Sequence, residues 1–324
     1  MGTVDTTSAL TLIELAKRTN NGDIMKIVEV LSKKNAILQD AVWTMANQPT
    51  SHKVAQRVSE PTGSFRQING GVTIEASETK NFVEPICMLE AYSRVDKALV
   101  DLAPDQKEFR MTEDLAFLGG LAKSMATALF YGDLSLYPER IQGLSLRTDW
   151  DATTDANVVA GGDTGAATTS LWIINWDVTE GAHLIYPKGS ETMGITSDDL
   201  GVRLIYPTTT SLYEAYVTHF KVWFGLVIRE PRAVQRIVNL APTYGDSKDL
   251  DPVSLVKALD KMLSSDKAVI YCNRSVKTVL DIEAMNKSNG FYTIENIFGK
   301  QIPAFQGVPV KLCEGITNQE TAVA

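Results

Sequence analysis

The amino-acid sequence predicts an α+β fold, and three stretches carry this prediction. Residues 112–131 have apolar side chains at helical spacing, and residues 213–229 have the alternating pattern of one long strand. Residues 251–312 alternate short amphipathic helices with buried strands, which is typical of a compact α+β unit. With 324 residues, the chain is long enough for one large domain or two medium ones.

The composition narrows the classes of protein to consider. An apolar fraction of 44% supports a real core, and no apolar run is long enough to span a membrane. The net charge of −8 argues against a broad nucleic-acid-binding surface, because phosphate contacts need clustered Lys and Arg. It leaves open a container that encloses nucleic acid without gripping it. The N-terminus lacks the pattern of a signal peptide, so we expect a soluble protein made in the cytoplasm.

The 112–131 segment is predicted to be a long helix with one apolar side. Thr112 is a plausible N-cap, and the acidic Glu113 and Asp114 complement the positive end of the helix dipole. Gly119 and Gly120 lie in the middle, where each costs about 1 kcal/mol relative to alanine. We therefore expect the helix to bend most easily at this pair. The apolar stripe comprises Leu115, Leu118, Leu121, Ala122, Met125 and Leu129.

The part of the chain before this helix has too few apolar residues to fold by itself. Residues 8–18 and a segment starting at Asp23 are predicted to be two short amphipathic helices of an N-terminal arm. Residues 48–92 read as a two-stranded ribbon with turns at 61–63 and 69–71. Such a ribbon is marginal in water unless a partner covers it, so we expect arm and ribbon to lie on neighbouring copies.

Six ribbon residues are candidates for these contacts between subunits, although for any single charge plain solvation is the simpler interpretation. They are Arg57, Phe65, Arg66, Ile68, Glu75 and Glu84.

After the long helix, residues 149–169 are rich in Asp, Thr, Ala and Gly and read as a flexible surface insertion. Their glycine cluster lacks the Gly-Lys-Ser/Thr ending of a phosphate loop. Pro231 suits the first turn of a helix that continues to Val238. Asp251 and Asn273 are the predicted N-caps of two later helices. The predicted strands between and after these segments are residues 171–176, 183–186, 201–206, 213–229, 268–272, 291–294 and 308–312.

We predict no catalytic, cofactor-binding or metal-binding residues. The histidines, His52, His183 and His219, have no carboxylate or cysteine partners at metal-ligand spacing and are interpreted as structural. Asp198 and Asp199 are interpreted as part of a loop turn rather than as metal ligands. Other polar and aromatic candidates are assigned to structure as well. The cysteines are expected to be buried thiols: Cys87, Cys272 and Cys313. The tryptophans of the predicted strands are expected to anchor the core or an interface: Trp172, Trp176 and Trp223. Three arginines are interpreted as solvated charges, salt-bridge partners or residues in glancing contact with DNA: Arg229, Arg232 and Arg236.

Several motifs resemble tailed-phage major capsid proteins. Residues 297–310, IFGKQIPAFQGVPV, resemble the closing stretch of that family. Residues 5–12, 88–96 and 109–118 resemble its short-tailed-phage branch. Matches continue in the same order at 172–176, 186–190, 199–201 and 216–239, so the resemblance covers nearly the whole chain.

The resemblance implies the Hong Kong 97-like capsid fold. In that fold, the chain would comprise an N-terminal arm (1–47), an extended E-loop (48–92), a peripheral domain (93–239) and an axial domain (240–324). The peripheral domain would contain the spine helix at 112–131 and the insertion at 149–169. Gly119 and Gly120 would be a hinge of that helix during shell maturation.

The implied function is that of a coat subunit rather than an enzyme. Hexamers and pentamers would form an icosahedral head around double-stranded DNA, assembled in the host cytoplasm with scaffolding, portal and decoration proteins. No long charged coiled coil precedes the arm, which favours a separate scaffolding protein or none cleaved from this chain. Two alternatives stay open: an encapsulin-like nanocompartment shell and, from another class, an α+β hydrolase capped by the ribbon.

Overall fold

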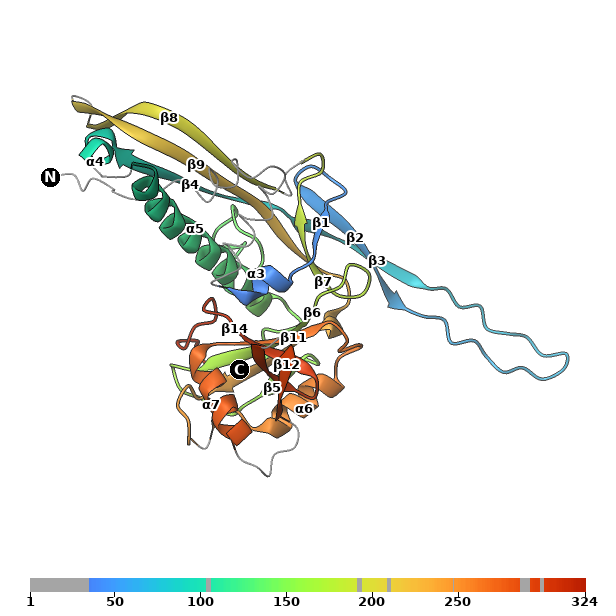
Figure 1. The fold of residues 1–324 in the computed structure, drawn as a ribbon. Helices are drawn as coiled ribbons and strands as arrows, with labels where there is room; N and C mark the ends of the chain where they lie inside the picture. Colours follow the sequence, from blue (N-terminus) through green and yellow to red (C-terminus); the bar gives the residue numbers. More distant parts are fainter. Residues whose placement is uncertain are drawn as a thin grey trace.

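The computed structural model describes residues 35–102, 106–190, 194–208, 211–246, 248–285, 292–297 and 300–324. Figure 1 shows an elongated molecule in which one sheet with a long helix lies beside a second, more compact unit, and a narrow hairpin projects from their junction. The two predicted helices within residues 8–31 lie outside the described residues. No helix in the described ranges is long and apolar enough to cross a membrane.

The first sheet is built around one very long strand. This strand, β9, pairs antiparallel with β4, β7 and β8, and β1 adds parallel to β7. The alternating pattern at 213–229 is thus confirmed as a strand. The bounds are β1 (Trp43–Met45), β4 (Cys87–Asp96), β7 (Ala182–Tyr186), β8 (Ile195–Thr208) and β9 (Ser211–Ile228). The helices beside this sheet are α3 (Ala36–Asp40), α4 (Lys97–Leu102) and α5 (Gln106–Tyr131).

The second sheet has seven strands in the order β12-β13-β14-β11-β6-β10-β5. Three of its strands precede residue 241 in the chain, so the expected domain boundary at 239/240 cuts through this sheet. The strands are β5 (Val158–Ala160), β6 (Thr169–Asn175), β10 (Val234–Leu240), β11 (Ala268–Cys272), β12 (Tyr292–Ile297), β13 (Lys300–Phe305) and β14 (Val308–Leu312). The helices of this unit are α6 (Pro252–Asp260) and α7 (Arg274–Met285), and short 3-10 turns η1 (Leu144–Leu146) and η2 (Pro231–Ala233) occur elsewhere.

The projecting hairpin consists of β2 (Ser51–Ser59) and β3 (Glu78–Pro85), which pair only with each other among the described residues. The predicted ribbon is therefore confirmed, but its expected end at residue 92 is not an element boundary. β4 starts at Cys87 and already belongs to the first sheet. The expected arm, residues 1–47, likewise includes β1, which pairs with β7 and so belongs to the first sheet.

The long helix is confirmed, and its predicted start is wrong. α5 begins at Gln106, so Thr112 lies within the helix and is not its N-cap. The apolar stripe packs into the core as predicted through Leu118, Leu121, Ala122, Met125 and Leu129, whereas Leu115 is exposed.

The predicted N-caps of the two later helices are confirmed. Asp251 Oδ1 accepts a hydrogen bond from the Val253 N–H at 3.0 Å, and Asn273 Oδ1 accepts one from the Val276 N–H at 2.9 Å.

Two segments differ from their predicted type. The helix predicted to start at Pro231 is wrong: only η2 forms there, and residues 234–240 are the buried strand β10. Every side chain of that strand is buried, and such a continuous run fits a central strand as well as a helix. The predicted surface insertion at 149–169 is also partly core, because Trp150 is buried and β5 pairs with β10.

Two smaller corrections concern strands. The acidic pair Asp198 and Asp199, interpreted as a turn, lies within β8, which is longer than the predicted 201–206. The link between residues 294 and 308 contains the unpredicted strand β13.

The three cysteines are free and buried, as predicted, and burial raises the pKa of each thiol to about 12.

Candidate assembly surfaces

The hairpin tip is the most exposed apolar segment that the structure describes. Phe65, Ile68 and Ile74 are at least 93% exposed, and they lie in the part of the hairpin beyond its paired strands. Figure 1 shows this part reaching far from both sheets. Isolated two-stranded ribbons are marginal in water, so the exposed tip indicates a surface that another molecule covers.

The hairpin is fixed at its base by a buried ion pair. Arg147 donates to both carboxylate oxygens of Glu84, at 2.6 and 2.9 Å, and also to the carbonyl of Leu226 at 3.2 Å. Glu84 is 8% exposed, so this side chain is used within the subunit. Glu84 is thus paired inside its own subunit, because Arg147, far along the chain, folds back to meet it. Its predicted contact with a neighbour stays a prediction.

The other polar candidates on the hairpin make local contacts. Glu75 Oε2 accepts hydrogen bonds from the backbone N–H groups of residues 62 and 63, at 2.8 and 3.2 Å. Arg66 donates to the carbonyl of Gly70 at 3.2 Å, and Arg57 lies 3.7 Å from Glu60. These contacts are solvent-exposed and worth little to stability, so the three side chains remain accessible to a partner.

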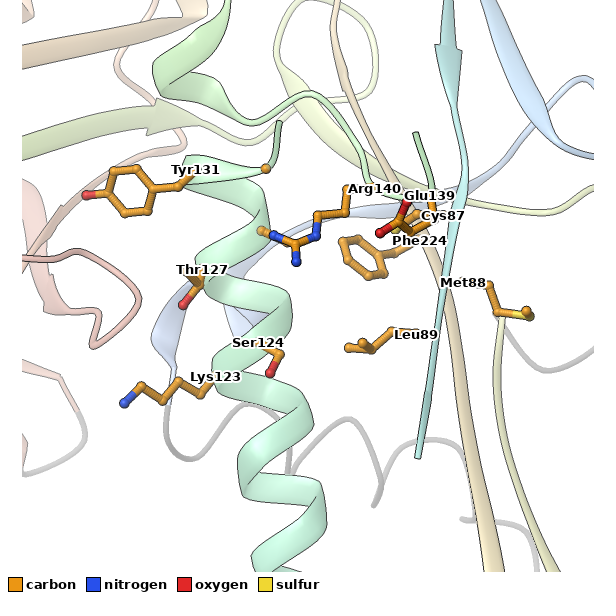
Figure 2. Close-up of a pocket in the computed structure, with 12 residues that line it drawn as sticks. Cys87, Met88, Leu89, Lys123, Ser124, Thr127, Tyr131, Glu139, Arg140 and Phe224 are labelled. Atoms are coloured by element: carbon orange, nitrogen blue, oxygen red, sulfur yellow. The ribbon is translucent and has the colours of Figure 1, made fainter. Parts of the chain in front are cut away.

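A groove between α5 and the first sheet is the second candidate surface. Figure 2 shows α5 on one side, Leu89 and Phe224 on the other, and Arg140 extending into the space between them. The cavity measures about 460 Å³. A second hollow of about 430 Å³ shares Leu89 and Ser124 with it and continues along α5 past Gly120. Sequence reasoning missed this groove, because its walls come from segments that only the tertiary structure brings together.

The histidines pack within the subunit, and His52 and His183 are buried. His183 is fully buried, and burial lowers its pKa to about 4, with Arg229 and His52 adding to the effect. Its ring is therefore neutral at pH 7. His219 stacks on Tyr92 with 4.3 Å between ring centroids. Within the described residues, no three His, Cys, Asp or Glu side chains converge as metal ligands would.

Arg232 and Arg236 differ in burial and in their acidic partners. Arg236 is buried and pairs with Glu320 at 3.0 Å, whereas Arg232 is half-exposed and pairs with Glu230 at 2.8 Å. The interpretation of these residues as solvated charges is wrong for Arg236, and the salt-bridge alternative holds. Trp172 and Trp176 are core residues as expected, and Trp223 is partly buried.

The comparisons with known proteins agree with this architecture. A chain in the structure of bacteriophage Epsilon15 is 29% identical, with a TM-score of 0.67, and the match covers 100% of this chain and 99% of that chain. The bacteriophage JBD30 capsid shares the fold at 11% identity, with a TM-score of 0.51 and coverage of 94% and 99%. No curated protein matches.

A family model described as major capsid protein GP7 matches residues 19–324. This match confirms the resemblance to tailed-phage capsid proteins and the Hong Kong 97-like fold that it implied. The chain therefore belongs to the major capsid protein GP7 family and is a phage coat protein.

Proposed function

We propose that this coat protein assembles as hexamers and pentamers into an icosahedral phage head that encloses double-stranded DNA. The observation that supports this best is the hairpin, which exposes three large apolar side chains at its tip. Copies of the same chain are the natural cover, because a shell repeats one surface contact many times. In this proposal, the hairpin of one copy lies on the body of the next.

Electrostatics supports a container rather than a DNA-binding protein. The subunit carries a net charge of −8, so a shell built from it repels phosphate overall. DNA is thus enclosed without tight or sequence-specific binding. Scaffolding, portal and decoration proteins are the expected partners, and assembly takes place in the host cytoplasm. No catalytic role is proposed, because the fold is used for assembly.

The alternatives are less well supported. An encapsulin-like shell would use the same subunit shape, but the family match is to phage major capsid proteins. An α+β hydrolase requires a nucleophile beside a base, and the buried His183 has no hydrogen-bond partner at either ring nitrogen.

Size-exclusion chromatography followed by negative-stain microscopy tests the proposed function. The purified full chain is expected to elute in the void volume as closed particles, alone or after addition of the scaffolding protein. A stable monomer with the hairpin folded onto its own body, under both conditions, would contradict the proposal. Nuclease protection of DNA in heads from infected cells tests the cargo separately.

We also propose that Gly119 and Gly120 act as a hinge of α5 when the shell matures. α5 is one continuous helix through the pair, Gly119 is buried, and Gly120 is exposed. A Cβ atom added at Gly120 would meet nothing within 4 Å, so alanine fits there.

Replacing both glycines with alanine is expected to stabilise the helical conformation by about 1 kcal/mol per residue. The helix should then bend less easily, and shell expansion should be slower. Time-resolved scattering of immature shells measures the expansion rate, and cryo-microscopy measures their curvature. The single variant Gly120→Ala, which changes only the exposed glycine of the pair, is the matched control. Unchanged kinetics and curvature in the double variant would refute the hinge.

A further inference from the structure

The two halves of α5 are anchored to the body very differently. After the glycine pair, Met125, Ala126, Leu129 and Phe130 are all at most 2% exposed and belong to the main core cluster. Before the pair, most described apolar side chains of the helix are exposed or half-buried, and Leu118 is the buried exception. The first half of α5 is therefore held to the sheet by few contacts, and polar groups matter more there.

The most deeply buried of these polar groups is Asp114, whose side chain is completely buried. The hydroxyl of Ser93 on β4 donates to its Oδ1 at 2.6 Å. Its Oδ2 is buried and has no hydrogen-bond partner. An ionised carboxylate in this position would have one hydrogen-bonded oxygen and one buried oxygen without a partner. Burying a charged oxygen away from water without a hydrogen bond costs free energy. A protonated carboxyl avoids that cost.

The groups that face Asp114 do not neutralise it. The strand register places Ser93 on β4, Thr218 on β9 and Asp199 on β8 abreast beneath the helix. Arg110, one turn before Asp114 on α5, directs its guanidinium to Asp199 at 3.3 Å and over the ring of Tyr216 at 4.2 Å. The nearby positive charge is thus balanced by Asp199, and Asp114 is left as an additional acid.

We propose that Asp114 is a proton-dependent latch, whose neutral carboxyl holds the first half of α5 against β4 and whose ionisation favours release of that half. Release would pivot at Gly119 and Gly120, since the second half stays in the core. The latch is a property of the subunit and can be measured without assembly. Only its consequence for the shell, a pH-sensitive position of α5, rests on the proposed function.

The direction of the pH effect follows from the proton affinities of the two states. Burial raises the pKa of Asp114 to about 8 in the docked helix, an effect that Ser93 and Arg110 reduce and Asp199 increases. In the released helix, the carboxyl has its ordinary pKa, about 4. The docked state therefore binds the proton more tightly, and docking weakens as the pH rises from about 4 to about 8, with no further loss above that range.

Hydrogen exchange of the full-length chain measures the release. After correction for the intrinsic rate, peptides from residues 106–118 are expected to open roughly 10- to 100-fold more at pH 7.5 than at pH 5.5. Peptides from residues 121–131 serve as the internal reference and should change little. Asp114→Asn keeps the shape but cannot ionise, so its exchange should be independent of pH over this range.

The control variant Glu113→Gln removes the same charge from the adjacent, half-buried position and should behave like the wild-type protein. Ser93→Ala removes the bond that favours the ionised form, so its pH dependence should extend to higher pH. The proposal is overturned if the wild-type chain shows no pH-dependent opening at 106–118, or if Asp114→Asn retains it. Should Asp114→Asn fail to fold, the wild-type and Ser93→Ala profiles decide the question.

Discussion

Glu320→Ala is expected to lower the free energy of unfolding by about 3–5 kcal/mol, because it leaves the buried charge of Arg236 without a partner. The two side chains are 3% and 6% exposed, and Arg236 Nη2 lies 3.0 Å from Glu320 Oε2. Arg236 also donates to the carbonyl of Trp150 at 2.8 Å and lies over the ring of Trp172. Urea unfolding of the unassembled subunit measures the loss.

The same carboxylate connects three parts of the molecule. Glu320 accepts hydrogen bonds from Tyr131 at the end of α5 and from Ser170 on β6, and its backbone pairs with Thr168. Burial and the Glu320 charge both raise the pKa of Tyr131, so the phenol stays protonated and continues to donate. Loss of the carboxylate would therefore loosen the C-terminal segment from the helix and from the second sheet together.

Glu314→Ala is the matched control for this prediction. Glu314 also pairs with an arginine, Arg274, at 3.4 Å, but the two side chains are 50% and 78% exposed. Such surface pairs contribute about 0–1 kcal/mol, so this variant should unfold almost like the wild-type protein. If Glu320→Ala costs no more than Glu314→Ala, the buried network does not stabilise the fold as described. Replacing Glu320 and Arg236 together with methionine should recover most of the loss.

The second large effect is expected at the hairpin tip. The double variant Phe65→Asp/Ile68→Asp should weaken association roughly 10²- to 10⁴-fold, because each apolar side chain gains about 1.5–3 kcal/mol on burial and a tenfold change corresponds to 1.4 kcal/mol. The subunit itself should stay folded, since both side chains are almost fully exposed in it. Light scattering of the assembly reaction measures the change, and circular dichroism of the subunit verifies the fold.

The conservative variant Phe65→Leu/Ile68→Val keeps the apolar character and is the control for altered side chains alone. It should assemble with little loss. Normal assembly of the aspartate variant would show that the tip is not buried between subunits. The hairpin would then need another explanation, such as contact with a partner of a different sequence.

Local sequence patterns predicted the elements whose signals lie within one turn or one strand. The stripe on α5 was recognised from its spacing, and Asp251 and Asn273 were recognised as caps because a cap bonds to backbone only two or three residues away. The alternation along β9 was equally local. The tailed-phage resemblance added what no local pattern contains, namely that such subunits build a shell.

The misassigned sites depend on contacts between distant parts of the chain. An acid near a helix start resembles a dipole partner, and Ser93 on a separate strand determines that Asp114 is instead buried. Glu84 resembles a surface charge until Arg147 reaches it from another segment. The run at 234–240 is uniformly buried and fits helix or strand, and pairing with β6 decides for the strand.

The sequence by itself thus determined the long helix, the long strand, the unsupported ribbon and, through its motifs, the capsid family. Only the tertiary structure decided which strands share a sheet, where the ribbon is anchored and which acids are buried. The physical reason is one of range. Helical spacing, strand alternation and capping act between neighbours in the chain, whereas burial and ion pairing are set by whichever distant segment packs against a residue.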